Sequence, residues 1–168
     1  MKTTTIKLYE YSELAEEAKK KALDAWNENS DMPFLPSMLQ DECGQLLKAH
    51  DIKCLSNHPK CLYSLSYCQG DGLMFEGKFE WKDYYAIIKH DGRYYHSNSK
   101  TYELVDAEGV EAPQASCDAF EAIYQDICKK LEKLGYELIA EETSEAHFID
   151  ECNANEWTFE ANGVMRNA

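Results

Sequence analysis

The residues best suited to chemistry are Gln69, Gly70, Asp71 and Gly72, which lie between two segments of alternating apolar and polar residues. The glycines would let the backbone approach a ligand closely, and Asp71 could bind a cation or act as a general base. The same residues suit a four-residue β-hairpin loop, in which glycine accepts a positive φ and aspartate bonds to the backbone. A phosphate-binding loop is excluded, because no Lys-Ser/Thr pair and no helix follow the glycines. The pattern favours the turn, with a contact or ligand site as the alternative.

His90 and His96 are candidate metal ligands, with Asp91 beside them. Asp91 and Gly92 are typical of a two-residue hairpin turn, here between strands at residues 84–90 and 93–95. Because side chains alternate along a strand, this turn would point the two histidines to opposite faces of the sheet. Spacing shows no Ser-His-Asp or Cys-His arrangement either. The sequence therefore predicts ordinary strand histidines and no catalytic residue.

Seven cysteines are spread along the chain: Cys43, Cys54, Cys61, Cys68, Cys117, Cys128 and Cys152. Their odd number argues against a complete disulfide framework, and no two lie at the spacing of a zinc knuckle. Several fall on apolar periodicities where a small buried residue would fit. We therefore expect buried, reduced, structural thiols, with no metal and no cofactor.

Acidic residues are concentrated in the last third of the chain. Residues 1–100 carry 15 Asp and Glu against 13 Lys and Arg, whereas residues 101–168 carry 16 against 4. Such a density of unpaired carboxylates repels itself, so it indicates either a contact with a basic partner or a contribution to solubility. It also argues against direct binding of nucleic acid, whose phosphates would be repelled. The candidate partner-binding residues are Glu137, Glu141, Glu142, Glu145, Asp150, Glu151 and Glu156.

Length and composition predict one folded domain over residues 1–168. A hydrophobic content of 44% with 12% aromatic residues excludes a generally disordered chain. No apolar run is long enough to span a membrane, and no signal-peptide core follows Met1. We therefore expect a location in the cytoplasm.

The periodicity of apolar residues predicts the elements that position these groups. Helices are expected after Ser12 as N-cap to about residue 26, at 37–50, at 117–134 with Gly135 as the end, and at 144–152. Strands are expected at residues 3–11, 61–68, 73–82, 84–90, 93–95, 100–105 and 156–160, the last followed by an Asn162-Gly163 turn. This order predicts an α+β fold: a mostly antiparallel sheet of about five to six strands with about four helices packed on one side.

Three segments together resemble an uncharacterised family of small proteins carried by bacteriophages and prophages. They are residues 7–19 (KLYEYSELAEEAK), the central QGDG motif at residues 69–72 with Phe75 and Gly77 after it, and residues 155–163 (NEWTFEANG). The resemblance covers most of the chain and implies a small accessory phage gene, with no assigned chemistry. Ala161 departs from the pattern, which leads us to expect an acidic residue there. Such genes often encode inhibitors of host defence, including anti-CRISPR and anti-restriction proteins, and some of these are acidic nucleic-acid mimics.

The sequence thus predicts an acidic, phage-encoded binding protein without catalytic activity. Its expected partner is a host defence protein or ribonucleoprotein complex with a basic surface, located in the host cytoplasm. The acidic residues at 137–160 would occupy a groove lined by Lys and Arg and exclude DNA or RNA. The alternatives are a small enzyme or ligand-binding module centred on residues 69–72, or an antitoxin-like regulatory partner.

Overall fold

The computed structural model describes residues 6–166, which divide into two compact units. Unit 1 combines Met1–Met32 with Leu138–Ala168, and unit 2 is the continuous segment Pro33–Glu137. The single domain expected over residues 1–168 stays a prediction, because compactness alone does not show whether the two units fold separately.

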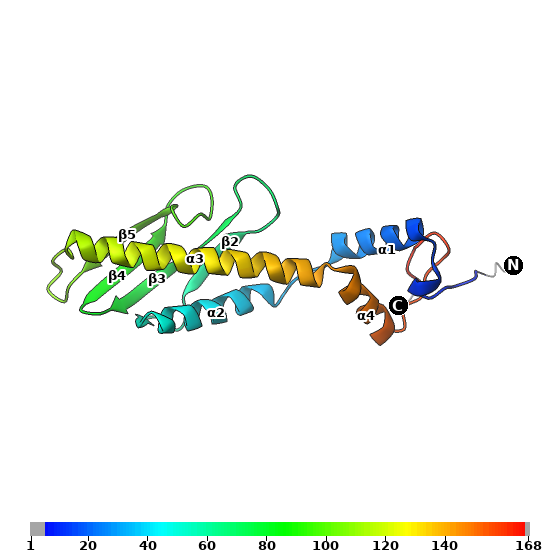
Figure 1. Cartoon of the computed structure of the whole chain (residues 1–168), viewed down its shortest axis with the longest axis horizontal. Helices are drawn as coiled ribbons and strands as arrows, with labels where there is room; N and C mark the ends of the chain where they lie inside the picture. The colour runs from blue at the N-terminus through cyan, green and yellow to red at the C-terminus, as the bar shows by residue number, and fades with distance from the viewer. Residues whose placement is uncertain (1–5, 167–168) are drawn as a thin grey trace, which may run out of the picture. The chain divides into compact units, whose positions relative to one another are not determined.

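Within residues 6–166, five antiparallel strands form a sheet that belongs to unit 2 (Figure 1). The strands are β1 (Ile52–Cys54), β2 (Lys60–Ser64), β3 (Gly72–Trp81), β4 (Tyr84–His90) and β5 (Lys100–Val105). β1 and β2 pair with different stretches of β3, β4 pairs with β3, and β5 pairs with β4. The predicted α+β class and the antiparallel sheet are confirmed.

Two helices, α2 (Leu35–Ala49) and α3 (Gln114–Glu142), cover the face of the sheet that carries Phe75. α3 docks through Tyr124, whose ring lies 4.6 Å from that of Phe75 and whose hydroxyl donates to the Phe75 carbonyl over 3.0 Å. Cys61 lies opposite Phe75 in the sheet, so the two side chains share a face. The Cys61 thiol donates to the Leu39 carbonyl of α2, which places α2 on this face as well. Aromatic rings and aliphatic side chains therefore fill one core between the sheet and these two helices.

The predicted end of α3 at Gly135 is wrong, since the helix continues to Glu142. Gly135 is buried, and a Cβ there would collide with the Leu65 side chain. The glycine therefore permits close packing in the middle of a helix and does not terminate it. Sequence reasoning read a packing glycine as a helix stop.

The predicted two-residue hairpin at Asp91 and Gly92 is also wrong. His90 pairs with Lys100, so residues 91–99 form a longer loop between β4 and β5, and residues 93–95 are no strand. This register places the buried Ala86 opposite Leu104, which is also buried. Burial of apolar side chains at the β4–β5 pairing thus outweighs the local preference of Asp-Gly for a tight turn.

Unit 1 contains a short 3₁₀ helix (Tyr11–Glu13), α1 (Glu16–Asn29) and α4 (Glu145–Ala154). α4 confirms the helix predicted from Ser144, whose hydroxyl accepts the backbone N–H of His147 at 3.1 Å. The N-cap of α1 is Ala15, so the predicted capping role of Ser12 is wrong. The core of the unit consists of Tyr11, Leu14, Ala18, Ala22, Phe148, Cys152 and Phe159.

The strands predicted at both ends of the chain are reduced to single bridges in unit 1. Tyr9 bridges Phe159, and Phe159 also bridges Met165. Residues 3–5 of the first predicted strand lie outside the described residues. The predicted turn at Asn162 and Gly163 is present, with Gly163 at a φ of 84°. No helix in the described part of the chain is long and apolar enough to cross a membrane.

Candidate functional site

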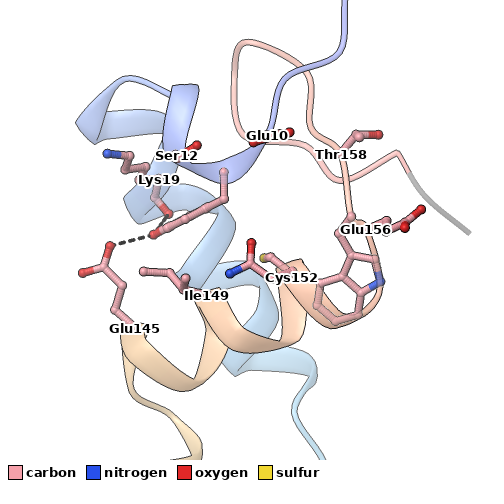
Figure 2. A pocket seen from close by; sticks show the side chains of 11 residues that line it. Glu10, Ser12, Lys19, Glu145, Ile149, Cys152, Glu156 and Thr158 are labelled. Carbon is pink, nitrogen blue, oxygen red and sulfur yellow. Dashed lines mark hydrogen bonds between the residues drawn. The ribbon is translucent and has the colours of Figure 1, made fainter.

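Unit 1 contains an open pocket of about 730 Å³, shown in Figure 2. Its walls come from the N-terminal segment, α1, α4 and the segment that follows α4. The polar lining includes three carboxylates and one ammonium group: Glu10, Glu145, Glu156 and Lys19. The apolar lining includes Tyr11, Ile149, Cys152 and Trp157. The pocket therefore combines excess negative charge with apolar and aromatic walls.

Tyr11 anchors the pocket to the core of unit 1. Its buried ring contacts the edges of Phe148 and Phe159, with centroid distances of 5.1 and 5.9 Å. The hydroxyl reaches the pocket and donates to Glu145 Oε1 over 2.9 Å (Figure 2). Burial, followed by the hydrogen bond to Glu145, raises the pKa of Tyr11 well above its usual value. Tyr11 therefore stays protonated at physiological pH and holds the Glu145 carboxylate in place.

Lys19 and Cys152, two further titratable groups of the pocket, are poorly placed to act as nucleophiles. Lys19 Nζ forms an ion pair with Glu16 Oε1 at 3.0 Å, so a carboxylate outside the pocket lining balances its charge. Burial raises the pKa of the Cys152 thiol to about 11, which keeps it protonated near neutral pH. The site is thus suited to binding a cation and poorly suited to covalent chemistry.

The structure divides the predicted acidic residues between the two units. Glu141, Glu142, Glu145, Asp150, Glu151 and Glu156 belong to unit 1, whereas Glu137 belongs to unit 2. Glu145 and Glu156 line the pocket. Glu151 is half-buried, and the other six are exposed.

Some of these carboxylates contact local partners, and others form no ion pair among the described residues. Glu137 pairs with Lys133 at 3.4 Å, and Glu142 contacts His147 at 3.3 Å. Glu151 accepts a hydrogen bond from the Asn155 side chain at 3.1 Å. Among residues 6–166, Glu141 and Asp150 have no ion pair. These two carboxylates are the most available of the predicted set for a partner.

The loop at residues 69–72 lies in unit 2, and Asp71 holds it together. Asp71 Oδ2 accepts the backbone N–H groups of Ser66 and Cys68 at 2.6 and 3.1 Å and the Tyr136 hydroxyl at 2.9 Å. Oδ1 accepts the Ser64 hydroxyl at 3.0 Å and the Cys68 thiol at 3.2 Å. Desolvation raises the pKa of Asp71, but the hydrogen bonds, those from Cys68 first, outweigh it and hold the pKa well below its usual value. Such a carboxylate is a weak general base.

The glycines of this loop allow close contact with the loop at residues 91–99. A Cβ at Gly70 would lie 2.7 Å from Tyr94 Cε1, and a Cβ at Gly72 would lie 2.7 Å from His96 Nδ1. Gln69 is exposed and Gly70 has a φ of 103°. Because Ser64 at the end of β2 pairs with Gly72 at the start of β3, the connection comprises residues 65–71, and the predicted four-residue hairpin loop at 69–72 is wrong. The longer loop packs on residues 91–99.

Sequence reasoning missed the aromatic pair beside this turn. Tyr67 is 69% exposed with a φ of 57°, and its ring lies 4.8 Å from that of Tyr136. The alternation of residues 61–68 predicted Tyr67 to lie in a strand, which is wrong because β2 ends at Ser64. The interpretation of Gly135 as a helix end separated Tyr136 from α3. Only the fold brings Asp71 and both tyrosines together.

His90 lies in β4 as predicted, whereas His96 lies in the loop at residues 91–99, so the prediction of a strand histidine is wrong for His96. The ring of His90 lies 5.2 Å from that of Tyr95, whereas His96 packs against Gly72. No group of three or more His, Cys, Asp or Glu within residues 6–166 could hold a metal ion. All seven cysteines are free: Cys43, Cys128 and Cys152 are buried, Cys54, Cys61 and Cys117 are half-buried, and Cys68 is exposed. The expectation of a buried thiol is therefore wrong for Cys68, which lies in the turn.

Comparisons with known proteins give no family to which the chain can be assigned. No protein-family model matches it, and neither curated proteins nor solved structures yield a match. Function must therefore be argued from the site itself.

Proposed function

We propose that the protein acts by stoichiometric binding to a basic host protein that handles nucleic acid, and that it inhibits this partner by occupying its Lys- and Arg-lined groove. The contact is the acidic surface of unit 1, formed by Glu141, Glu142, Glu145, Asp150 and Glu156. The proposed setting is a phage-encoded inhibitor of a defence complex, of the anti-CRISPR or anti-restriction type.

The observation that carries the proposal is the charge imbalance of unit 1. Its two segments contain 14 Asp and Glu against 6 Lys and Arg. Because Glu141 and Asp150 are exposed and have no ion pair among the described residues, their full charge is available to a partner. Charge of one sign on one surface attracts a partner of the opposite sign and speeds its association.

The alternative of an enzyme centred on residues 69–72 has less support. Each oxygen of Asp71 already accepts hydrogen bonds from its own loop or from Tyr136. A base needs a free lone pair and a pKa near the working pH, and Asp71 has neither. An antitoxin-like partner would use the same acidic surface, so identification of the partner separates that alternative from the proposal.

The test is affinity capture from host lysate with the tagged protein as bait, followed by elution in rising salt. A nucleic-acid-handling protein that elutes at moderate salt supports the proposal. Its affinity should fall steeply between about 0.05 M and 0.5 M salt, because the contact is between charges. A specific partner whose affinity does not change over this range would overturn the proposed contact.

Matched variants locate the contact on unit 1. The double variant Glu141→Gln/Asp150→Asn removes two charges from the surface and should weaken binding about tenfold at low salt. The control Glu103→Gln/Glu111→Gln removes two exposed charges from unit 2 and should leave the affinity within about twofold. Equal losses in both variants would mean that net charge, and not this surface, determines binding.

A further inference from the structure

We propose that the pocket of unit 1, which Glu145 and Trp157 both line, binds the guanidinium group of an arginine side chain presented by a protein partner. The inference rests on the proposed function for the identity of the partner. It adds a specific recognition site to a surface that otherwise acts through charge alone.

The charge of the pocket selects a cation. Three carboxylates line it, and Figure 2 shows Glu145, Glu10 and Glu156 on separate sides of the opening. Lys19, the one cation among the described residues of the lining, pairs with Glu16 at 3.0 Å. The pocket therefore keeps an excess of negative charge, which an arginine or lysine side chain would complement.

Glu145 is held in position for this contact. Its Oε1 atom accepts the Tyr11 hydroxyl, and Tyr11 is fixed by the buried rings of Phe148 and Phe159. No group in the described part of the chain donates a hydrogen bond to Oε2. A guanidinium can donate to this oxygen without breaking the bond to Tyr11, so the site is built before the ligand arrives.

The apolar wall favours arginine over lysine. Trp157 is half-buried beside Phe148, at a centroid distance of 6.3 Å, and Ile149 and Cys152 extend the wall. A planar guanidinium stacks on an indole and is weakly hydrated, whereas an ammonium is compact and keeps its water. A carboxylate and an indole lining one pocket are therefore matched to a flat cation.

The size of the pocket favours a peptide over a free amino acid. At about 730 Å³ it falls within the range of pockets that enclose drug-sized ligands. Ser12, Asn153 and Thr158 add polar groups to the lining. Such groups suit the backbone of a segment that carries the arginine.

The experiment titrates the isotope-labelled full-length protein with N-acetyl-arginine-N-methylamide and follows the Trp157 indole signal by NMR. We expect saturable binding with a Kd on the order of 1 mM, since a single side chain makes few contacts. The matching citrulline derivative, which has the same shape without the charge, should bind at least about tenfold more weakly. Equal binding of the two compounds, or no shift of the Trp157 signal, would overturn the inference.

Two variants test the residues. Glu145→Gln keeps an acceptor for Tyr11 but removes the charge, and should weaken binding at least about fivefold. Asp24→Asn removes an exposed charge from α1, outside the pocket lining, and should change the Kd less than twofold. A fold-preserving Trp157→Leu variant should also lose binding, followed here through the backbone amide signals of α4 because the indole is absent, with circular dichroism as the check on folding. Similar losses in Glu145→Gln and Asp24→Asn would mean that overall charge, and not this pocket, attracts the arginine derivative.

The same measurements separate failure of this inference from failure of the proposed function. If Glu141→Gln/Asp150→Asn lowers the affinity for the captured partner and Glu145→Gln does not, the acidic surface is supported and the arginine site is overturned. If the arginine derivative binds the pocket but no basic protein is captured, the guanidinium site is supported and the proposed function falls. If free arginine binds more tightly than N-acetyl-arginine-N-methylamide, the ligand is a small molecule, and the inference that a protein partner presents the arginine is overturned.

Discussion

Asp71 illustrates how a residue with catalytic chemistry can be used for structure. Its carboxylate accepts hydrogen bonds from five donors, among them the backbone N–H groups of Ser66 and Cys68 on either side of Tyr67. Tyr67 adopts a left-handed conformation that costs free energy for a residue with a side chain. The Asp71 hydrogen bonds compensate for this cost and fix the loop.

Asp71 should make the stability of the protein sensitive to acid. Its pKa is lower in the folded than in the unfolded chain, so the unfolded chain binds more protons as the pH falls below about 5. The contribution of Asp71 to the free energy of unfolding is therefore complete above about pH 5 and is lost progressively below it. We expect Asp71→Asn to lower the urea midpoint at pH 7. Because the variant lacks this carboxyl, its urea midpoint should also fall less steeply than that of the wild type below about pH 5. Asp83→Asn, at an exposed position, is the control, and an equal flattening there would contradict the role of Asp71.

At the scale of elements, two glycines in helices have opposite surroundings. Gly135 in α3 faces Leu65, and a Cβ at this position would collide with the leucine side chain. At Gly44 in α2, nothing beyond the adjacent residues and the local helix backbone lies within 4 Å of the position a Cβ would take. Alanine is a better helix former than glycine, so helix propensity alone predicts that a Gly→Ala change stabilises the protein at both sites. Once packing is considered, only the change at Gly44 is expected to stabilise it.

We therefore expect Gly135→Ala to lower the free energy of unfolding by about 1–3 kcal/mol, because overpacking outweighs propensity. Gly44→Ala should raise it by about 0.5–1 kcal/mol. Urea unfolding of the two variants gives both values. In a Leu65→Ala background the cost of Gly135→Ala should disappear, because the colliding side chain is gone. A cost that persists in this background would place the strain elsewhere in α3.

The same elements show what the sequence could and could not predict. β4 and β5 have the predicted bounds, and the Asp-Gly signal correctly marks the end of β4 at His90 although it does not form the predicted two-residue turn. Leu65 lies far from Gly135 in the sequence. A local pattern therefore could not predict that the two residues pack together or that α3 continues past Gly135. The acidic residues were found from composition, but the pocket draws its walls from segments at both ends of the chain. The contacts that could not be predicted are therefore those between residues far apart in the sequence.

At the scale of the whole molecule, the two units differ in how the chain builds them. Unit 2 is one continuous segment with its own core, in which Phe120 and Tyr124 of α3 contact Trp81 and Phe75 of the sheet. Unit 1 joins the two ends of the chain through the bridge between Tyr9 and Phe159. A continuous unit with its own core meets the requirements for independent folding, whereas a discontinuous unit needs both of its segments.

We expect a fragment of residues 33–137 to fold alone. It keeps the Tyr136 hydroxyl that donates to Asp71, and Lys133 lies about one turn before its new helix end, where a positive charge is favourable. Circular dichroism should show mixed helix and strand, and urea should unfold the fragment in one cooperative transition. A fragment of residues 33–112 lacks α3 and should not fold, because the rings of Phe75 and Trp81 lose their partners. If residues 33–137 do not unfold cooperatively, the chain is a single folding domain, as its length predicts.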